Sequence, residues 1–327
     1  MLTDEMKKEP LVFRPILRNV IWGGTELYRL KGLRADGEPV GESWEVSAIP
    51  GHESVVASGE YAGMSLGSLV ERFGSALLGS GVVRRHGFRF PLLVKIIDAR
   101  QNLSMQVHPD DRMAAMRHGT PGKTEMWYVA DTAPGARIFA GFSREIDRDE
   151  YRRRVADSSL PEVVASYESH RGDVFFIPAG RVHAIGAGNL LVEIQESSDV
   201  TYRIFDYDRR DALGNPRELH TELAAEALDF RVSPDYRTSL PAADSHGVTP
   251  LVECEHFKVA RIDVSGQHRV ASDGESSIVL VCTSGTVTLI CDGKPTEITC
   301  GNSVLCPACM TGGFDLIGNA TVIAATA

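Results

Sequence analysis

Residues 172–180 read Gly-Asp-Val-Phe-Phe-Ile-Pro-Ala-Gly, and residues 301–309 repeat the pattern as Gly-Asn-Ser-Val-Leu-Cys-Pro-Ala-Cys. These two stretches decide our interpretation of the fold. Each places a short apolar run between a glycine and a Pro-Ala pair, and each is followed by a Gly-Asn pair, at residues 188 and 318, that opens another apolar run. Short apolar runs bounded by Gly, Pro and Asn are typical of strands in an all-β barrel or sandwich. The repeat therefore predicts a duplicated β-barrel.

Strand-like runs also fill much of the sequence around the two copies. Residues 90–97, 190–194 and 277–282 are rich in Leu, Ile and Val and are bounded by turn-forming residues. Three other stretches carry apolar residues three and four positions apart with charges between them, which predicts helices. These stretches are residues 66–78, 147–166 and 218–228. We expect a mainly β fold with a small helical layer packed against it.

A linker separates the two copies of the repeat. Residues 231–250 are rich in Pro, Ser and Asp and contain few large apolar side chains. At 327 residues the chain also exceeds the usual size of one domain. We predict a catalytic domain over residues 1–235, with N-terminal strands and helical insertions, and a degenerate C-terminal β domain over residues 236–327. Gly312 stands where the first copy has His183, so we expect no metal ligands in the second domain.

The composition is that of an ordinary globular protein. Hydrophobic residues make up 43% and charged residues 24% of the chain, and no apolar run approaches the roughly 20 residues that span a bilayer. The N-terminal stretch does not read as a signal peptide, so we expect a cytoplasmic protein that does not bind membranes. A formal net charge of -10 argues against nucleic acid as a partner. A small anionic substrate fits that charge if a few cations gather in one pocket.

The cysteines all lie in the last quarter of the chain. They are Cys254, Cys282, Cys291, Cys300, Cys306 and Cys309. Cys306-Pro-Ala-Cys309 has the spacing of half a zinc knuckle or of a redox pair, but no second pair completes it. The repeat places Cys306 opposite Ile177 and Cys309 opposite Gly180, which suggests replaced structural residues. We favour core packing for the cysteines over a metal, redox or disulfide role.

Three separated segments supply side chains that bind metals. Gln106 and His108 stand two residues apart, so strand alternation points both to one face. Glu125 begins a strand after a turn, and His183 follows the Pro-Ala pair of the first copy. Each residue alone has a plainer interpretation, as a turn histidine, a solvated strand carboxylate or a capped loop histidine. Together, two imidazoles, one carboxylate and one amide oxygen suit a divalent ion, with zinc favoured and a position left for substrate.

Six motifs occur in a fixed order along the chain. They are NVIWGG at 19–24, GESWEVS at 41–47, FPLLVK at 90–95, LSMQVHP at 103–109, GKTEMW at 122–127 and PAGRVHA at 178–184, followed by Glu193 and Arg203. With these motifs the sequence resembles the short bacterial type I mannose-6-phosphate isomerases, zinc enzymes of the cupin fold, over nearly its whole length. The resemblance implies two cupin-like jelly-roll β-barrels, one Zn2+ per chain, and interconversion of D-mannose 6-phosphate and D-fructose 6-phosphate through an enediol or enediolate.

The resemblance also implies residue roles. Gln106, His108, Glu125 and His183 fall on the zinc ligand positions of the family, Arg203 falls on its catalytic arginine, and Lys123, Ser104, Lys95 and Glu193 fall on active-site positions. We expect Arg203, Lys123 and Glu193 to be catalytic and Ser104 and Lys95 to bind substrate.

Elementary chemistry leaves some of these roles open. Arg203 stays cationic, which suits it to stabilising an enediolate or a phosphate. Glu193 is a candidate general base, or else one partner of a structural salt bridge. Lys123 is a candidate proton shuttle, although substrate binding is the interpretation that we favour. Lys95, Arg203 and Ser104 are candidates for holding the phosphate.

Two other functions fit part of the pattern. One is a non-enzymatic cupin that binds sugars and uses its metal for structure or binding only. The other is an iron oxygenase, because two imidazoles and one carboxylate with open positions also suit iron. The sequence does not indicate an oligomeric state.

Overall fold

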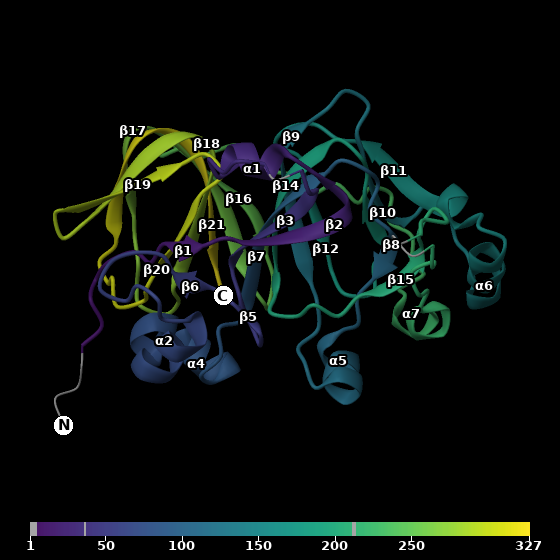
Figure 1. Ribbon diagram of the computed structural model, residues 1–327, viewed down its shortest axis with the longest axis horizontal. Helices are drawn as coiled ribbons and strands as arrows, with labels where there is room; N and C mark the ends of the chain where they lie inside the picture. The colour runs from purple at the N-terminus through teal and green to yellow at the C-terminus, as the bar shows by residue number, and fades with distance from the viewer. Residues whose placement is uncertain (1–4, 36, 211–213) are drawn as a thin grey trace.

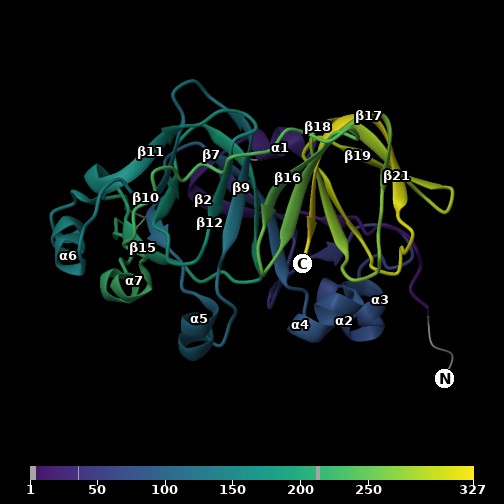
Figure 2. The ribbon, with the colours of Figure 1, turned by 180° about the vertical axis from the view of Figure 1, so that it is seen from behind.

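Antiparallel sheets form most of the protein, so the prediction of a mainly β chain is confirmed. The computed structural model describes residues 5–35, 37–210 and 214–327. Figure 1 shows two β bodies side by side, one built mainly from the teal middle of the chain and the other from its yellow-green C-terminal part. Figure 2 shows the same division from behind.

The first body contains two sheets. The five-stranded sheet runs in the order β11 (Val164–Glu168), β10 (Arg137–Phe142), β13 (His183–Ile185), β8 (Met105–Val107) and β15 (Tyr202–Phe205). The six-stranded sheet runs in the order β12 (Val174–Ile177), β9 (Glu125–Thr132), β14 (Asn189–Glu196), β7 (Leu92–Ala99), β2 (Ile16–Gly24) and β3 (Val40–Val46), and β3 also pairs with β7. No ladder among the described residues joins an edge of one sheet to an edge of the other. The predicted jelly roll is therefore an open sandwich rather than a closed barrel.

The second body is a further six-stranded sheet. Its main order is β16 (Val248–Glu253), β17 (Lys258–Val270), β21 (Phe314–Thr326), β18 (Ile278–Cys291) and β19 (Lys294–Thr299), with β20 (Ser303–Cys306) paired to β18. Two small two-stranded sheets complete the β structure. They join β1 (Phe13–Arg14) to β6 (Val55–Val56) and β4 (Ala48–Ile49) to β5 (His52–Glu53).

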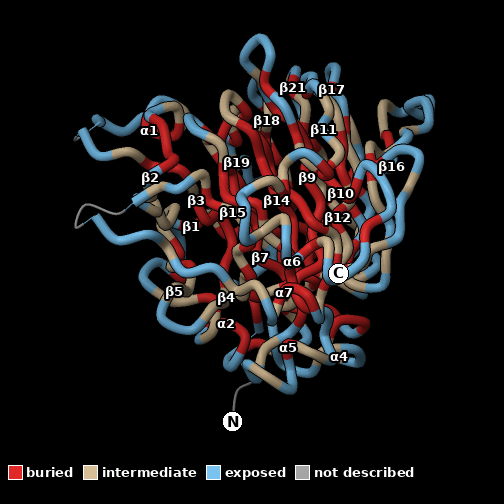
Figure 3. The backbone as a smooth tube through the Cα atoms, turned by 90° about the vertical axis from the view of Figure 1, so that its right-hand side faces the viewer, coloured by how far each residue is buried: buried red, intermediate tan, exposed pale blue. Residues whose placement is uncertain are grey.

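The six-stranded sheet of the first body is buried on both faces. Along β7, Val94 and Ile96 face a core that also contains Val281 and Ile323 of the second body. The intervening residue Lys95 points the other way, toward the five-stranded sheet, because side chains alternate along a strand. Figure 3 shows this burial as nearly continuous red strands in the middle of the molecule. One face of the sheet thus packs against the second body. The other face, which is turned toward the five-stranded sheet, can carry a functional site.

The internal repeat predicted from the sequence is present in the strand pairing. β12 follows Gly172 (φ 90°), and β20 follows Gly301 (φ 84°). β12 pairs with β9, which also pairs with β14, and β20 pairs with β18, which also pairs with β21. Both glycines have a backbone conformation that L side chains rarely adopt, which explains why the repeat keeps them.

N-terminal segments pack on the C-terminal sheet. Leu11 and Leu305 exchange backbone hydrogen bonds of 2.8 and 2.9 Å, and the N–H groups of Ala308 and Cys309 donate to the carbonyls of Leu77 and Ala76. Figure 1 accordingly places α2 and α4 beneath the second body. The N-terminal part of the chain therefore contacts both bodies. The domain boundary between residues 235 and 236 stays a prediction.

The helices are shorter than the sequence predicted. The predicted helix 66–78 is two helices, α2 (Leu66–Phe73) and α3 (Ser75–Leu78), separated at Gly74 with φ 50°. Only the first part of the predicted helix 147–166 is helical, as α6 (Arg148–Ala156). Beyond it, Pro161 lies in a short 3-10 turn and Val164 already pairs in β11. The third predicted helix, 218–228, is α7 (Thr221–Ala227). The helices that we did not predict are α1 (Glu26–Leu30), α4 (Ser80–His86) and α5 (Asp111–His118).

The six cysteines are free thiols, and three of them are buried in the second body. Cys282, Cys291 and Cys306 belong to its apolar core, and burial raises the pKa of the Cys282 thiol to about 12. No cluster of described residues suited to a metal includes a cysteine. Core packing thus accounts for these three.

Within the described residues, no helix has the length and apolar character that a bilayer crossing requires. A cytoplasmic location stays a prediction.

Candidate metal centre

Three neighbouring strands of the five-stranded sheet place predicted site residues in one row. His183 of β13 is paired with Gln106 of β8, and Gln106 is paired with Arg203 of β15. Residues directly opposite each other in antiparallel strands project from the same face. The row therefore presents an imidazole, an amide and a guanidinium to the space between the two sheets.

The facing sheet contributes a second set of side chains. Glu125 is the first residue of β9. Trp127 lies two residues further along β9, on the same face as Glu125. It is paired with Glu193 of β14, and Glu193 is paired with Lys95 of β7. His108 follows the last residue of β8 and reaches the same space from the first sheet. Side chains from six strands or strand ends thus converge.

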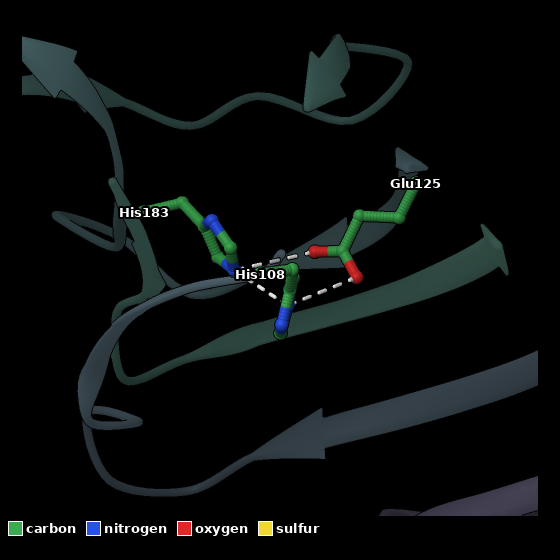
Figure 4. A group of neighbouring side chains, drawn as sticks. All are labelled: His108, Glu125 and His183. Atoms are coloured by element: carbon green, nitrogen blue, oxygen red, sulfur yellow. Dashed lines mark hydrogen bonds and ion pairs between the residues drawn. The ribbon is translucent and has the colours of Figure 1, made fainter. Parts of the chain in front are cut away.

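His108, Glu125 and His183 surround one point. The Nε2 atoms of the two histidines are 3.1 Å apart, Glu125 Oε1 lies 3.4 Å from His183 Nε2, and Glu125 Oε2 lies 3.5 Å from His108 Nε2 (Figure 4). Four ligands bound tetrahedrally at 2.0–2.1 Å are separated from one another by about 3.3 Å. The observed separations, two of them to different oxygens of Glu125, are near that value, so the three side chains are close enough to hold one small divalent ion.

Hydrogen bonds orient both imidazoles for this purpose. His108 Nδ1–H donates to the carbonyl of Val200 at 2.9 Å, and His183 Nδ1–H donates to the carbonyl of Arg181 at 2.8 Å. The Nε2 lone pairs then face the common point. Burial lowers the pKa of His183 to about 3 and that of His108 well below its usual value. Both rings are neutral near pH 7, which is the form that binds a metal.

Glu125 is a buried carboxylate without adequate partners. Its side chain is fully buried, and neither oxygen accepts a hydrogen bond from the residues that the structure describes. Lys123 Nζ approaches Oε2 to 3.3 Å, which is an ion-pair distance without hydrogen-bond geometry. Burial, together with the charge of Glu193, raises the pKa of Glu125 to about 8. A cation between the carboxylate and the imidazoles would remove this cost, so the residues present fit a metal ion.

Gln106 completes the group from the neighbouring strand. Its Nε2 lies 3.3 Å from Nε2 of His183. Metal binding requires the amide oxygen instead, and a half-turn of the terminal amide exchanges the two atoms without moving the rest of the side chain.

A charged cluster lies next to the metal centre. Lys95 Nζ is 3.0 Å from Glu193 Oε1 and 3.8 Å from Glu42 Oε2, and Trp127 Nε1–H donates to Glu193 Oε2 at 2.8 Å. Burial alone would lower the pKa of Lys95, but the two carboxylates outweigh it and raise that pKa. Burial alone would raise the pKa of Glu193, but Lys95 and Lys123 lower it to about 2. Glu193 is therefore one partner of a salt bridge, which was one of our two interpretations.

Arg203 lies at the rim of this space within a group of arginines. Its Nη1 donates to the carbonyl of Glu218 at 3.1 Å, whereas its buried Nε has no partner. Burial lowers the pKa of Arg203, and Arg217 and Arg209 act in the same direction. Arg209 and Arg217 both pair with Asp206. Two guanidinium groups thus pair with one carboxylate, and Arg203 lies near them, which leaves positive charge available for an anion.

The structure thus brings most of the predicted residues together. His108, Glu125 and His183 meet at one point, Gln106 lies beside His183, Lys123 lies beside Glu125, and Lys95 and Glu193 lie in the adjacent row. Ser104 is buried just before β8. Sequence reasoning missed Glu42, Arg209 and Arg217 as members of the site. Glu42 lies inside the GESWEVS motif, which was the available signal, whereas nothing in the local sequence set the two arginines apart.

Comparisons with known proteins agree with this architecture. Residues 11–132 match the family model "Phosphomannose isomerase type I, catalytic domain", and residues 247–327 match "Mannose-6-phosphate isomerase, cupin domain". The chain is 38% identical over 263 residues to mannose-6-phosphate isomerase ManA of Bacillus subtilis, covering 80% of this chain and 81% of that protein. It is 35% identical over 277 residues to mannose-6-phosphate isomerase of Streptococcus mutans, covering 84% of each.

A solved structure extends the similarity to the whole chain. The crystal structure of mannose 6-phosphate isomerase from Bacillus subtilis superposes with a TM-score of 0.88 at 32% identity, covering 97% of this chain and 99% of that one. A structure from Archaeoglobus fulgidus at 24% identity, with a TM-score of 0.80, shares the fold. The predicted cupin-type fold is confirmed by the cupin-domain match and these superpositions.

Proposed function

Because the chain belongs to the type I mannose-6-phosphate isomerase family, we propose that it interconverts mannose 6-phosphate and fructose 6-phosphate with one zinc ion held by Gln106, His108, Glu125 and His183. The chain is an aldose-ketose isomerase by this membership. The observation that carries the zinc proposal is the fully buried Glu125 carboxylate, which faces two neutral imidazoles and accepts no hydrogen bond.

The donor set, two imidazoles with a carboxylate and an amide oxygen, is the reason to propose zinc. Tetrahedral coordination at 2.0–2.1 Å gives separations of about 3.3 Å, whereas ligands at right angles with the same bond lengths lie about 2.9 Å apart. The two carboxylate-to-imidazole distances, 3.4 and 3.5 Å, involve different oxygens of Glu125, and the two imidazole nitrogens lie 3.1 Å apart, between the two values. Metal analysis of the purified protein therefore has to separate zinc from iron. A zinc ion bound there supplies a Lewis acid for the negative charge that develops on the sugar oxygens during isomerisation.

The chain's own residues have to move one proton between C1 and C2 of the sugar. Glu193 is ionised and therefore able to accept a proton, but its pairs with Lys95 and Trp127 make it a weak base. Lys123 lies beside a proposed metal ligand, where its ammonium group can donate a hydrogen bond to a sugar oxygen. We assign Lys123 to holding the substrate oxygens and keep Glu193 as the proton acceptor, which acts when substrate binding loosens its contact with Lys95.

The phosphate belongs nearer to Arg203 than to Lys95. Lys95 already faces two carboxylates, so its charge is compensated within the protein. Among the described residues Arg203 Nε is buried without a hydrogen-bond partner, and Arg209 and Arg217, whose charges act on Arg203, pair with Asp206. Guanidinium groups bind phosphate through paired hydrogen bonds. We therefore propose Arg203 as the main phosphate or enediolate ligand, with Ser104 in a supporting role.

A coupled assay of mannose 6-phosphate conversion tests the proposal. Purified protein should be active, lose activity with a zinc chelator, and regain it on addition of Zn2+ but not of Mg2+. Metal analysis should find one zinc per chain. Zinc-loaded protein that binds the sugar phosphate without converting it would support the non-enzymatic cupin instead, and iron in the purified protein would support the oxygenase.

A further inference from the structure

A buried carboxylate links the two β bodies next to the metal centre. Glu196 is the last residue of β14 and is 5% exposed. Its Oε1 accepts the backbone N–H of Thr124 at 2.6 Å, and its own N–H donates to the Thr124 carbonyl at 3.1 Å. Its Oε2 lies 3.1 Å from Nδ1 of His256. The Glu196 carboxylate is thus hydrogen-bonded to Thr124 on one side and lies at ion-pair distance from His256 on the other. His256 also lies 3.2 Å from Glu255 Oε1 and 4.0 Å from Asp111 Oδ2.

Thr124 is the residue between Lys123 and Glu125. The register of β9 with β14 ends at Glu125 and Gln195, and beyond it Thr124 accepts the backbone N–H of Glu196 while its own N–H donates to the Glu196 side chain. Thr124 Oγ1 also accepts the N–H of Ala179 at 3.3 Å, in the loop that leads to His183. A shift of the Thr124 peptide would move both the Lys123 ammonium and the Glu125 carboxylate, which are 3.3 Å apart.

His256 belongs to the C-terminal body. It lies in the turn between β16 and β17, where the Cys254 N–H donates to the Phe257 carbonyl at 3.0 Å. The next residue, Phe257, is 1% exposed and packs in the core that the two bodies share. The imidazole side chain itself is 15% exposed. The turn is thus anchored at its base, and its histidine has a fixed position opposite Glu196.

We propose that Glu196 and His256 are positioning residues through which the C-terminal body holds Thr124, and with it Lys123 and Glu125, in the geometry that catalysis requires. This inference rests on the proposed isomerase function. It gives the C-terminal body, for which the sequence predicted no metal ligands, a part in the active site. Residues that orient metal ligands through hydrogen bonds change activity or metal affinity by about 10–100-fold when removed.

The test uses conservative and disruptive variants of both residues in the full-length, zinc-loaded protein. Glu196→Ala and His256→Ala should lower kcat about 10–100-fold, with a smaller change in KM. Glu196→Gln keeps an acceptor for the Thr124 N–H, and His256→Asn places an amide near the position of Nδ1, so both should recover most of kcat. His268→Ala is the matched control, because His268 is a half-buried histidine of the same body that bonds through Nδ1 to the His246 carbonyl. It should leave kcat unchanged.

A second readout does not depend on turnover. In protein loaded with Co2+ in place of zinc, the visible absorption bands report the ligand geometry, and they should shift in the two alanine variants but not in His268→Ala. Alanine variants with unchanged kcat and unchanged cobalt spectra would overturn the inference. If Glu196→Ala does not fold, the comparison of His256→Ala with His256→Asn tests the inference by itself. If the wild-type protein has no isomerase activity, the proposed function fails, and the cobalt spectra still decide whether this contact positions the metal ligands.

Discussion

Replacing Glu125 by glutamine should flatten the pH dependence of stability of the metal-free protein above pH 6.5. Burial raises the pKa of Glu125 from 4.5 to about 8, so the folded protein holds a proton that the unfolded chain has already released. The stability contributed by this group is fully present below pH 4.5 and is lost as the pH rises toward 8. Glutamine cannot ionise, so the variant should show no such loss.

The histidines limit the window in which this effect can be seen. Burial lowers the pKa of His183 to about 3 and that of His108 in the same direction. The unfolded chain protonates its histidines below about pH 6.5, so these two groups destabilise the fold as the pH falls and oppose Glu125 between pH 4.5 and 6.5. From pH 6.5 to 8, Glu125 is the one proposed ligand that still contributes. At about 1.4 kcal/mol per pH unit, this window gives about 2 kcal/mol.

Urea unfolding of the wild type and of Glu125→Gln, both with chelator, measures the effect at the two ends of the window. Subtracting one protein from the other removes groups common to both, including Glu196, whose pKa burial also raises to about 8. The difference in unfolding free energy should change by about 2 kcal/mol in favour of the variant as the pH rises. A constant difference, or a change in the opposite direction, would refute the conclusion that the metal-free centre contains a protonated, buried carboxylate.

Three further variants test the site. His183→Ala should empty the metal site, as measured by bound zinc, and retained zinc would contradict the ligand assignment. The same variant should change the unfolding free energy of the metal-free protein by less than about 2 kcal/mol, because the second copy of the repeat has Gly312 at this position. Arg203→Ala should lower kcat about 100-fold or more while the protein keeps its zinc, and loss of zinc would show that the arginine acts on the metal site. Lys95→Met should lower the unfolding free energy by about 3–5 kcal/mol because it leaves Glu193 buried without its cation; adding Glu193→Gln should recover part of that loss, and a fully stable single variant would contradict the salt bridge.

The sequence predicted the parts of the protein that depend on local patterns. Short apolar runs between turn residues gave the strands, and the repeat at residues 172–180 and 301–309 gave their duplicated arrangement. The helices were less well predicted. Apolar spacing continued past Ala156, but a proline and the pairing of Val164 with β10 ended the helix there. Pairing with a distant strand is a tertiary effect, which local spacing does not contain.

The site residues also fall into two groups, those that local sequence patterns identify and those that they do not. The four proposed ligands lie in motifs, so their residue types and the resemblance were enough to select them. Glu42, Glu196 and His256 were not selected, because their importance arises only from partners far away in the sequence. Glu196 meets His256 and the Thr124 backbone through the register of β14 and the turn before β17. Register sets which side chains meet, and it cannot be read from one strand alone.

The charges in the site explain how an acidic chain can receive a dianionic sugar phosphate. Without a metal, burial favours the protonated form of Glu125, and Lys95 lies between Glu193 and Glu42. A divalent cation adds two positive charges and releases the proton of Glu125, so the centre gains one positive charge on binding it. Arg203, and Arg209 and Arg217, which pair with Asp206, add to it. In a protein of net charge -10, this is the local positive region that an anionic substrate needs, so the proposed metal supports substrate binding as well as chemistry.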